Sequence, residues 1–297
     1  MKARSPSRVY ENTPDVWKNL FPFPQADSHK YSRGTALIRG GAVMTGAARL
    51  AARTAQRVGA GLVTLASPAV ALSIYAEALE SVIVRLCDTA QEWQVLVDNE
   101  RKPALLIGPG LGLGSAQKAE VMMALAAKRP TVVDADGLTN FADTPEILFQ
   151  ALHTDCVLTP HEGEFMRLFG EIEGDKPSRA FAAAQRAGCV VLLKGAKTVI
   201  ASPNGDAQVN HNAPPWLATA GAGDVLAGMI LGLVAQKMPV FQAAAASAWM
   251  HGRIASLNGP GLIAEDIVEG IPAVLREILD LQHSRFKPDR KNNGLEI

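Results

Sequence analysis

Residues 218–228 combine small side chains with one acid, Asp224, directly before an apolar run that predicts a helix through residue 235. The small residues let a ligand approach the main chain closely. The free N–H groups of a helix's first turn, together with the helix dipole, attract anions. A carboxylate there would repel a phosphate that is merely bound, so we expect Asp224 to take a proton from a substrate hydroxyl while the main chain holds the phosphoryl charge. The alternative is that Asp224 only caps the helix.

Two further acids end the apolar run at residues 131–136, which we expect to form a strand. Open α/β sheets bind their ligands at the carboxyl ends of the strands. Asp134 and Asp136 lie at such an end and are suited to hold a metal ion directly or through water. Capping of the following helix explains these two acids equally well.

His161 follows an apolar run at residues 156–159 and is suited to hydrogen-bond a ligand or to exchange protons near pH 7. Glu164 comes three residues later, where it would reach a metal-bound water. Glu162 and Glu164 also suit the first turn of a helix, because negative charge is favourable there. For Glu162 this structural interpretation is the one we favour.

Two loops that follow expected strands have the composition of ligand-binding loops. In residues 194–198, Lys194 or Lys197 is suited to contact a phosphate, and Gly195 lets the main chain approach a nucleotide. For Lys197 the alternative is an exposed loop lysine. Residues 108–114 contain four glycines, but the pattern is weak by itself because it lacks both the Rossmann spacing and the Lys-Ser/Thr of a P-loop.

Strands and helices that alternate along the chain would position these residues. Strands are expected at 35–38, 62–66, 82–84, 104–107, 131–136, 156–159 and 190–193, followed by a hairpin of 199–201 and 207–209. Helices are expected at 45–58, 69–80, 115–128, 225–235, 240–254 and 271–281, with Pro272 in the first turn of the last one. His251, within the 240–254 helix, is interpreted as a satisfied core or surface histidine and not as a ligand-binding residue. We therefore predict an α/β fold, a three-layer sandwich with a mostly parallel central sheet and helices on both faces.

Composition excludes several classes of partner. The 297 residues include 29 basic and 29 acidic side chains, so the net charge of zero argues against nucleic acid or an anionic membrane as the main partner. No signal peptide and no membrane-spanning stretch is expected. The three cysteines, Cys87, Cys156 and Cys189, are far apart and are interpreted as buried apolar residues in a cytoplasmic protein.

We divide the chain into an N-terminal arm, residues 1–28, one domain, residues 29–282, and a polar C-terminal tail, residues 283–297. Within the arm, residues 10–28 predict a short helix followed by an extended segment. Its aromatic side chains should pack onto the domain or onto a neighbouring subunit.

Seven short segments, in this order, resemble the ribokinase-like superfamily and within it the ADP-dependent NAD(P)H-hydrate dehydratases. The segments run from about residue 29 to about residue 275: His29-Lys30 with Gly34, residues 45–64, 108–112, 134–136, 158–164, 193–198 and 218–228. Four features depart from the family pattern. Ala222 replaces a frequent threonine and Ala220 a frequent glycine, and both stay small, so the anion pocket should survive. Tyr31-Ser32 stands where the family often has Gly-Asp, which puts a role for a carboxylate in that loop in doubt, and the short arm leaves no room for the epimerase domain that many relatives carry.

The resemblance implies a repair reaction. A hydrated nicotinamide ring carries a hydroxyl where NADH or NADPH has a double bond, and the enzyme uses ADP to convert this hydroxyl of the S epimer into a phosphate. Elimination then restores NAD(P)H and releases AMP and phosphate. Mg²⁺ would offset the phosphate charge, no side-chain metal ligand is assigned, and the family implies a homo-oligomer, possibly a tetramer.

Carried over position by position, the resemblance implies two groups of site residues. The hydrate site would use Ala47, Gly112, His161 and Asp224, with Asp224 as the catalytic base. The nucleotide site would use Lys194, Gly195, Ala196, Lys197, Thr198 and Gly223. The competing interpretations are an ATP-dependent kinase of a small vitamin-like alcohol, with the same acid, and a non-catalytic nucleotide sensor. The sequence does not decide between ADP and ATP or between the two hydrates.

Overall fold

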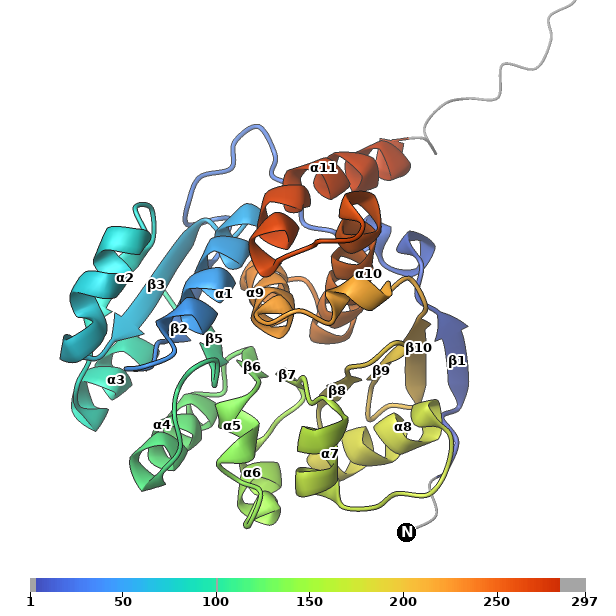
Figure 1. Ribbon diagram of the computed structural model, residues 1–297, viewed down its shortest axis with the longest axis horizontal. Coiled ribbons are helices and arrows are strands. Elements are labelled where there is room, and N and C mark those ends of the chain that lie inside the picture. Colours follow the sequence, from blue (N-terminus) through green and yellow to red (C-terminus); the bar gives the residue numbers. More distant parts are fainter. Residues whose placement is uncertain (1–3, 100, 284–297) are drawn as a thin grey trace, which may run out of the picture.

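One β-sheet runs through the middle of the fold and separates two layers of helices (Figure 1). The computed structural model describes residues 4–99 and 101–283, and within them the sheet has ten strands in the order β1-β10-β9-β8-β7-β6-β5-β2-β3-β4. Neighbouring strands are parallel except where β9 pairs with β8 and with β10. The predicted three-layer α/β sandwich with a mostly parallel sheet is therefore confirmed.

The strands are short and most are buried. In chain order they are β1 (Arg8–Glu11), β2 (Thr35–Arg39), β3 (Leu62–Ser67), β4 (Ile83–Leu86), β5 (Ala104–Ile107), β6 (Thr131–Val133), β7 (Cys156–Leu158), β8 (Val190–Leu193), β9 (Thr198–Ala201) and β10 (Asp206–Asn210).

The helices of the described residues fall between the strands, with three more after the last strand. They are α1 (Thr45–Arg57), α2 (Leu72–Ala78), α3 (Ala90–Val97), α4 (Ser115–Ala126), α5 (Asp136–Thr139), α6 (Pro145–Ala151), α7 (Glu162–Phe169), α8 (Lys176–Ala187), α9 (Ala222–Ala235), α10 (Val240–Asn258) and α11 (Ala264–His283). Short 3-10 turns cover Pro14–Val16, Lys18–Leu20, Ala69–Ala71 and Pro215–Leu217.

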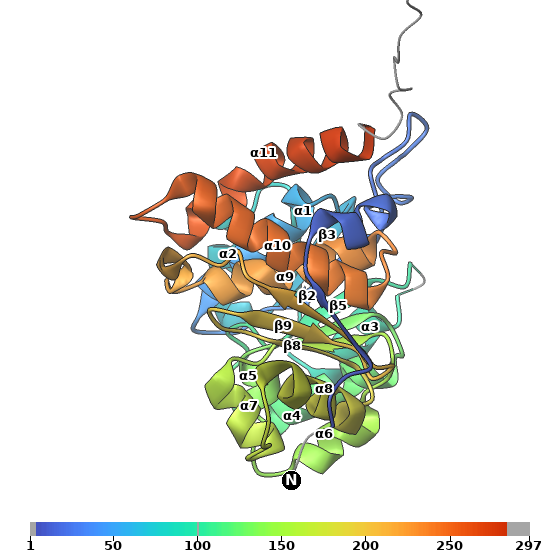
Figure 2. The ribbon, with the colours of Figure 1, turned by 90° about the vertical axis from the view of Figure 1, so that its right-hand side faces the viewer.

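The sheet has a hydrophobic core on each face, because successive side chains of a strand point to opposite sides. In β5, Leu106 packs into one core, while Leu105 and Ile107 pack into the other. Helices α1, α2, α9, α10 and α11 cover the first face, and α3 to α8 cover the second (Figure 2).

Helices α1 and α9 pack against each other with almost no side chain between them. A Cβ atom at Gly228 would lie 2.5 Å from the carbonyl oxygen of Ala51, and one at Gly232 would lie 2.7 Å from that of Ala55. These contacts explain the small residues of both helices. They also fix the start of α9, and with it Asp224, relative to the start of α1.

The arm differs from its prediction. Residues 8–11 form β1, an edge strand parallel to β10, and two 3-10 turns follow in place of the expected helix. All four residues of β1 are exposed, so no apolar pattern in the sequence predicts this strand. Its pairing with β10 determines it. The aromatic residues Trp17 and Phe21 are buried against the domain, as expected. The domain boundaries stay a prediction, and the tail beyond residue 283 lies outside the described residues.

The last helix also differs from its prediction, since α11 begins at Ala264 and holds Pro272 in its interior. Proline lacks an N–H group, so the carbonyl of Val268 loses its usual helical partner. The expected start at residue 271 was wrong because proline was taken as a marker of the first turn. Helices α3, α6 and α8 were not predicted as separate elements, whereas α7 begins at Glu162, which confirms the favoured interpretation of that residue as an acid in the first turn of a helix.

Two predictions about composition can be checked directly. Cys87, Cys156 and Cys189 are free thiols and all three are buried, which confirms them as small core residues. Among the helices of residues 4–99 and 101–283, none combines the length and the apolar character that a membrane crossing demands.

Candidate functional site

Four loops meet at one edge of the sheet because the strands before them are parallel. Strands β5, β6, β7 and β8 pair side by side in one direction, so the loops after all four leave the sheet at the same edge. These loops are the glycine loop 108–114, residues 134–135, residues 159–161 and the lysine loop 194–197. The start of α9 reaches the same edge from the other helical layer, and it carries Asp224.

Asp224 is the third residue of α9 and not its cap. Gly221, in a left-handed conformation (φ 84°), takes the cap position, so the interpretation of Asp224 as a mere N-cap was wrong. The side chain is partly buried. Burial, followed by repulsion from Asp134 and from Asp136, raises the pKa of Asp224 to about 6, while Lys194 opposes the rise. A carboxyl group with this pKa is well suited to accept a proton near neutral pH.

Lys194 connects the acids of the site. Its Nζ donates to Oδ1 of the buried Asp134 at 2.9 Å and lies 3.8 Å from Oε2 of Glu164. Burial alone would lower the pKa of Lys194, but attraction to Asp134 and Glu164 outweighs it and the pKa is raised. A Cβ at Gly223 would lie 3.6 Å from the same Nζ. A permanent positive charge therefore faces the first turn of α9, beside Asp224.

The glycine loop is held by a short helix that begins at Asp136. The N–H of Gly112 donates to Oδ2 of Asp136 at 2.8 Å, and Nδ2 of Asn140 donates to the carbonyl of Gly112 at 2.9 Å. Asp136 is thus the first residue of α5, while Asp134 follows the end of β6 at Val133. Sequence reasoning missed Asn140, although its position four residues after Asp136 puts both on one face of a helix.

Close contact between main chains joins the glycine loop to the start of α1. A Cβ at Gly41 would lie 1.5 Å from the carbonyl oxygen of Gly110, and one at Gly110 would lie 2.5 Å from that of Met44. Both positions therefore require glycine. Ala47, in the first turn of α1 and buried, lies next to this junction. The structure brings the region of Ala47 and that of Gly112 together, as a shared substrate site would require.

His161 is the N-cap of α7. Its Nδ1 accepts from the N–H groups of Gly163 and Glu164, at 3.0 and 3.3 Å, so the neutral ring carries its proton on Nε2. Glu164 in return accepts from the N–H of His161 at 2.8 Å, which completes a capping box. The His161 side chain is 54% exposed. The ring is thus positioned by the main chain and still open to a ligand.

A cavity of ≈ 390 Å³ opens between the lysine loop and the start of α9. Five of the six residues expected to bind nucleotide line it: Lys194, Gly195, Ala196, Thr198 and Gly223. Lys197 is exposed and is not among the lining residues, which agrees with the alternative given for it. Apolar groups from Pro214, Pro215, Leu217 and Leu226 form much of the remaining wall. This combination of an apolar wall and a cationic end is suited to an adenine nucleotide.

His251 borders the same cavity as a neutral residue. Its Nε2 is 2.9 Å from the carbonyl of Ala222, to which it donates a hydrogen bond. Burial lowers the pKa of His251 to about 4. Of the two expected alternatives, a core or a surface histidine, the structure shows the buried one, and the side chain holds the first residue of α9 in place.

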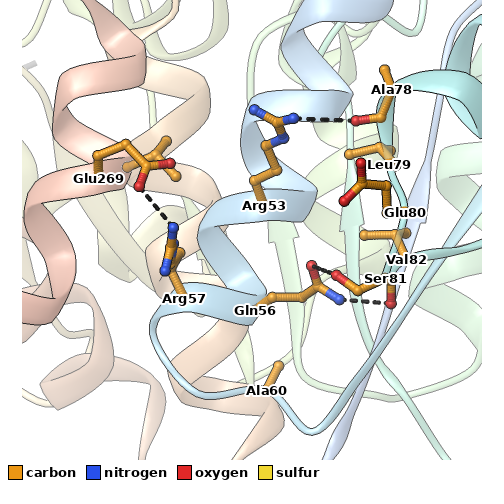
Figure 3. A pocket seen from close by; sticks show the side chains of 11 residues that line it. Arg53, Gln56, Arg57, Ala60, Ala78, Leu79, Glu80, Ser81, Val82 and Glu269 are labelled. Atoms are coloured by element: carbon orange, nitrogen blue, oxygen red, sulfur yellow. Dashed lines mark hydrogen bonds and ion pairs between the residues drawn. The ribbon is translucent and has the colours of Figure 1, made fainter.

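A second hollow, of ≈ 470 Å³, lies at the opposite end of α1 (Figure 3). Arg57 there pairs with Glu269 at 2.7 Å, and Arg53 donates to the carbonyl of Ala78 at 3.3 Å. These guanidinium groups are engaged by neighbours and do not converge on one point. The α1 residues that line the hollow, Arg53 to Arg57, also lie about 9 to 15 Å along the helix axis from Ala47, given a rise of about 1.5 Å per residue. We do not assign the reaction to it.

The His29-Lys30 motif serves the fold and lies away from Asp224. A Cβ at Gly34 would lie 1.8 Å from the carbonyl oxygen of Ala235, the last residue of α9. Asp224 is at the other end of this helix, about 16 Å away along its axis. The absence of a carboxylate at Tyr31-Ser32 therefore leaves the candidate site intact.

Comparisons with known proteins identify the family of this chain. Residues 35–268 match the family model described as NAD(P)H-hydrate dehydratase. The bifunctional NAD(P)H-hydrate repair enzyme of Salinibacter ruber is 38% identical over 93% of this chain, and that of Gloeobacter violaceus is 39% identical over 88%. The chain spans about half the length of these relatives, 54% and 51% respectively.

Solved structures share the fold. The ADP/ATP-dependent NAD(P)H-hydrate dehydratase of Bacillus subtilis, co-crystallised with ATP and Mg²⁺, is 28% identical with a TM-score of 0.78, and the match covers 92% of this chain and 99% of that one. A ribokinase-like superfamily protein of Enterococcus faecalis has a TM-score of 0.81 at 23% identity, covering 91% and 96% of the two chains. The likeness to the second protein concerns the fold alone. The chain belongs to the NAD(P)H-hydrate dehydratase family and has the ribokinase-like fold.

Proposed function

We propose that this protein removes water from the S epimer of hydrated NADH or NADPH at the expense of ADP. The observation that carries the proposal is the position of Asp224, a proton acceptor in the first turn of α9, beside the Lys194 ammonium and at the edge of the cavity. A hydroxyl activated by Asp224 would meet a phosphoryl group held by the same helix turn. Family membership supports the reaction class.

The chemistry needs the nucleotide because hydroxide is a poor leaving group. Asp224 takes the proton of the substrate hydroxyl, whose oxygen attacks the β-phosphorus of ADP, and the bond to AMP breaks. The C–O bond of the new phosphate ester then breaks, inorganic phosphate leaves with the electron pair, and the neighbouring carbon gives a proton to the departing phosphate, which restores the double bond. Lys194 and the N–H groups at the start of α9 would stabilise the charge on the transferring group.

We assign the two ligands to the two sides of Asp224. The adenine nucleotide would occupy the cavity lined by Lys194, Gly195, Ala196, Thr198 and Gly223, with its phosphates toward α9. Lys197, exposed and outside the lining, would contribute little. The hydrated dinucleotide would lie along the glycine loop, against Gly112 and the Ala47 region, with His161 as its hydrogen-bonding partner.

Mg²⁺ would enter with the nucleotide. Among residues 4–99 and 101–283 no group of three His, Cys, Asp or Glu side chains is arranged to hold a metal. This fits Mg²⁺, which commonly binds phosphate oxygens and waters with only one or two carboxylates. Asp134 and Asp136 are the carboxylates available here. When bound, the ion would offset the phosphate charge during transfer.

The test is direct. Enzymatically hydrated NADH is incubated with the protein, Mg²⁺ and either ADP or ATP, and the NADH absorbance band is followed. Return of the band with matching release of AMP from ADP supports the proposal, and the comparison decides the preferred nucleotide. No return of the band, with phosphorylation of a thiazole or pyridoxal alcohol by ATP, would establish a kinase instead. Nucleotide binding with neither reaction would indicate a sensor.

Two further properties belong to the proposal. We propose a homo-oligomer, on the resemblance to the family. We propose a cytoplasmic location, on the three free buried thiols. Sedimentation and cell fractionation test these statements.

A further inference from the structure

Lys176, the first residue of α8, contacts the lysine loop from beneath. Its Nζ donates to the carbonyl of Lys194 at 2.9 Å. The same Nζ lies 3.2 Å from Oε1 of Glu162, the first residue of α7. Lys176 does not line the cavity and therefore acts on the loop and not on a ligand.

The Lys176 ammonium packs directly against the main chain of Gly195, whose conformation favours glycine. A Cβ at Gly195 would lie 2.5 Å from the Lys176 Nζ, and Gly195 has φ of +153°, a conformation that side chains disfavour. The Lys176 ammonium thus occupies the volume that a side chain at residue 195 would fill. The main chain of the loop is packed directly on this cation.

A second basic residue fixes the acid partner of Lys176. Arg179, one turn further along α8, donates to Oε2 of Glu162 at 2.7 Å. Both basic side chains are only 21% exposed, while that of Glu162 is 49% exposed. The chain of contacts therefore runs from Arg179 through Glu162 and Lys176 to the carbonyl of Lys194.

The placement of Lys176 is costly for the fold. A positive charge is unfavourable in the first turn of a helix, where acids are preferred. Burial lowers the pKa of Lys176, although its bond to Glu162 opposes this. We therefore expect the Lys176 side chain to have a role that offsets this loss of stability. The carbonyl to which it donates belongs to Lys194, and the Nζ of Lys194 in turn donates to Asp134.

We propose that Lys176 is a positioning residue for the nucleotide: through its bond to the Lys194 carbonyl it sets the main chain of residues 194–198 in the conformation that binds ADP. The proposal rests on the proposed function. It also implies that Glu162, which orients Lys176, acts on nucleotide affinity although it touches neither ligand.

The experiment compares Lys176→Met and Lys176→Arg with a matched control on the same helix. Arg186, near the end of α8, likewise donates to a main-chain carbonyl, that of Phe169, and pairs with an acid, Glu146. Arg186→Met removes a carbonyl hydrogen bond and an ion pair of the same kind, together with a contact on the Phe149 ring, away from the lysine loop. ADP affinity is measured by calorimetry, and turnover is measured with hydrated NADH and ADP.

Lys176→Met is expected to weaken ADP binding and raise the KM for ADP by about tenfold, with kcat and the KM for the hydrate within about twofold of wild type. Lys176→Arg should recover part of the affinity, because a guanidinium can still bridge the carbonyl and Glu162. Arg186→Met should leave ADP affinity within about twofold. Amide exchange of residues 195–198, measured without nucleotide, should accelerate in Lys176→Met only.

Unchanged ADP affinity in Lys176→Met, an equal loss in Arg186→Met, or an equal rise in the KM of both substrates would overturn the proposal. If the wild-type protein binds ADP without dehydrating the hydrate, the proposed function fails, and the affinities still decide the role of Lys176. If the wild-type protein does not bind ADP, both proposals are overturned.

Discussion

Replacement of Asp224 by Asn should stabilise the protein while it abolishes turnover. The carboxylate is partly buried near Asp134 and Asp136, and these surroundings make its ionised form unfavourable in the folded state. Asparagine has nearly the same shape and no charge. Ionisation of Asp224, the proposed base of the reaction, therefore lowers the stability of the folded protein.

The magnitude follows from the pKa of Asp224, which is about 6 in the fold against a reference value of 3.8. A difference of about two pKa units corresponds to about 3 kcal/mol. Because the folded pKa is raised, the folded state binds the proton more tightly than the unfolded state. The cost of ionisation is therefore absent below about pH 4, grows as the pH rises toward 6, and is complete above it.

Urea unfolding of wild type and Asp224→Asn at several pH values between 4 and 8 checks this. The difference in free energy of unfolding should be near zero at the acid end and should approach about 3 kcal/mol above pH 6. Asp143→Asn, at an exposed carboxylate, serves as the control and should show no such trend. An Asp224→Asn variant that is less stable than wild type at pH 8, or a gain that is independent of pH, would refute the reasoning.

Three further outcomes are expected. The kcat/KM for dehydration should rise with pH through about 6 and then level off, because Asp224 must be ionised to accept a proton; a flat profile across pH 5–7 in steady-state assays would argue against this role. Lys194→Met should lower kcat/KM by more than about 100-fold, whereas Lys197→Met, a change at an exposed loop lysine, should stay within about threefold in the same assay. Asn140→Ala should raise the KM for the hydrate by about three- to tenfold with little change for ADP, because the carbonyl of Gly112 loses its partner; equal rises for both substrates would indicate a general loss of structure.

The sheet and the order of the main loops could be predicted from sequence, because buried parallel strands are continuous apolar runs and glycine or acid follows them. The run before Gly108 and the one before Lys194 are examples, and both are strands with no exposed residue. For Asp134 and Asp136, this pattern predicts a position at the carboxyl edge of the sheet, where open α/β sheets bind their ligands.

Features fixed by tertiary contacts could not be predicted. Strand β1 has no apolar side, so only its pairing with β10 reveals it. Gly221 caps α9 and thereby puts Asp224 inside the helix. Gly221 has a left-handed conformation and lies between α1 and α11, where a Cβ atom would contact Leu50 and Ala264. Asn140 and Lys176 act through main-chain carbonyls far away in sequence, and the spacing of Asn140 from Asp136 does not by itself identify that partner.

The most direct test of the account is single turnover of hydrated NADH with ADP by wild type and Asp224→Asn, with ADP binding measured on the same samples. NADH and AMP should form in equal amounts with wild type, and Asp224→Asn should bind ADP normally and lose turnover by at least about 1,000-fold. Substantial turnover by Asp224→Asn, or NADH formation without AMP, would contradict a reaction in which this carboxylate activates the hydroxyl for phosphoryl transfer.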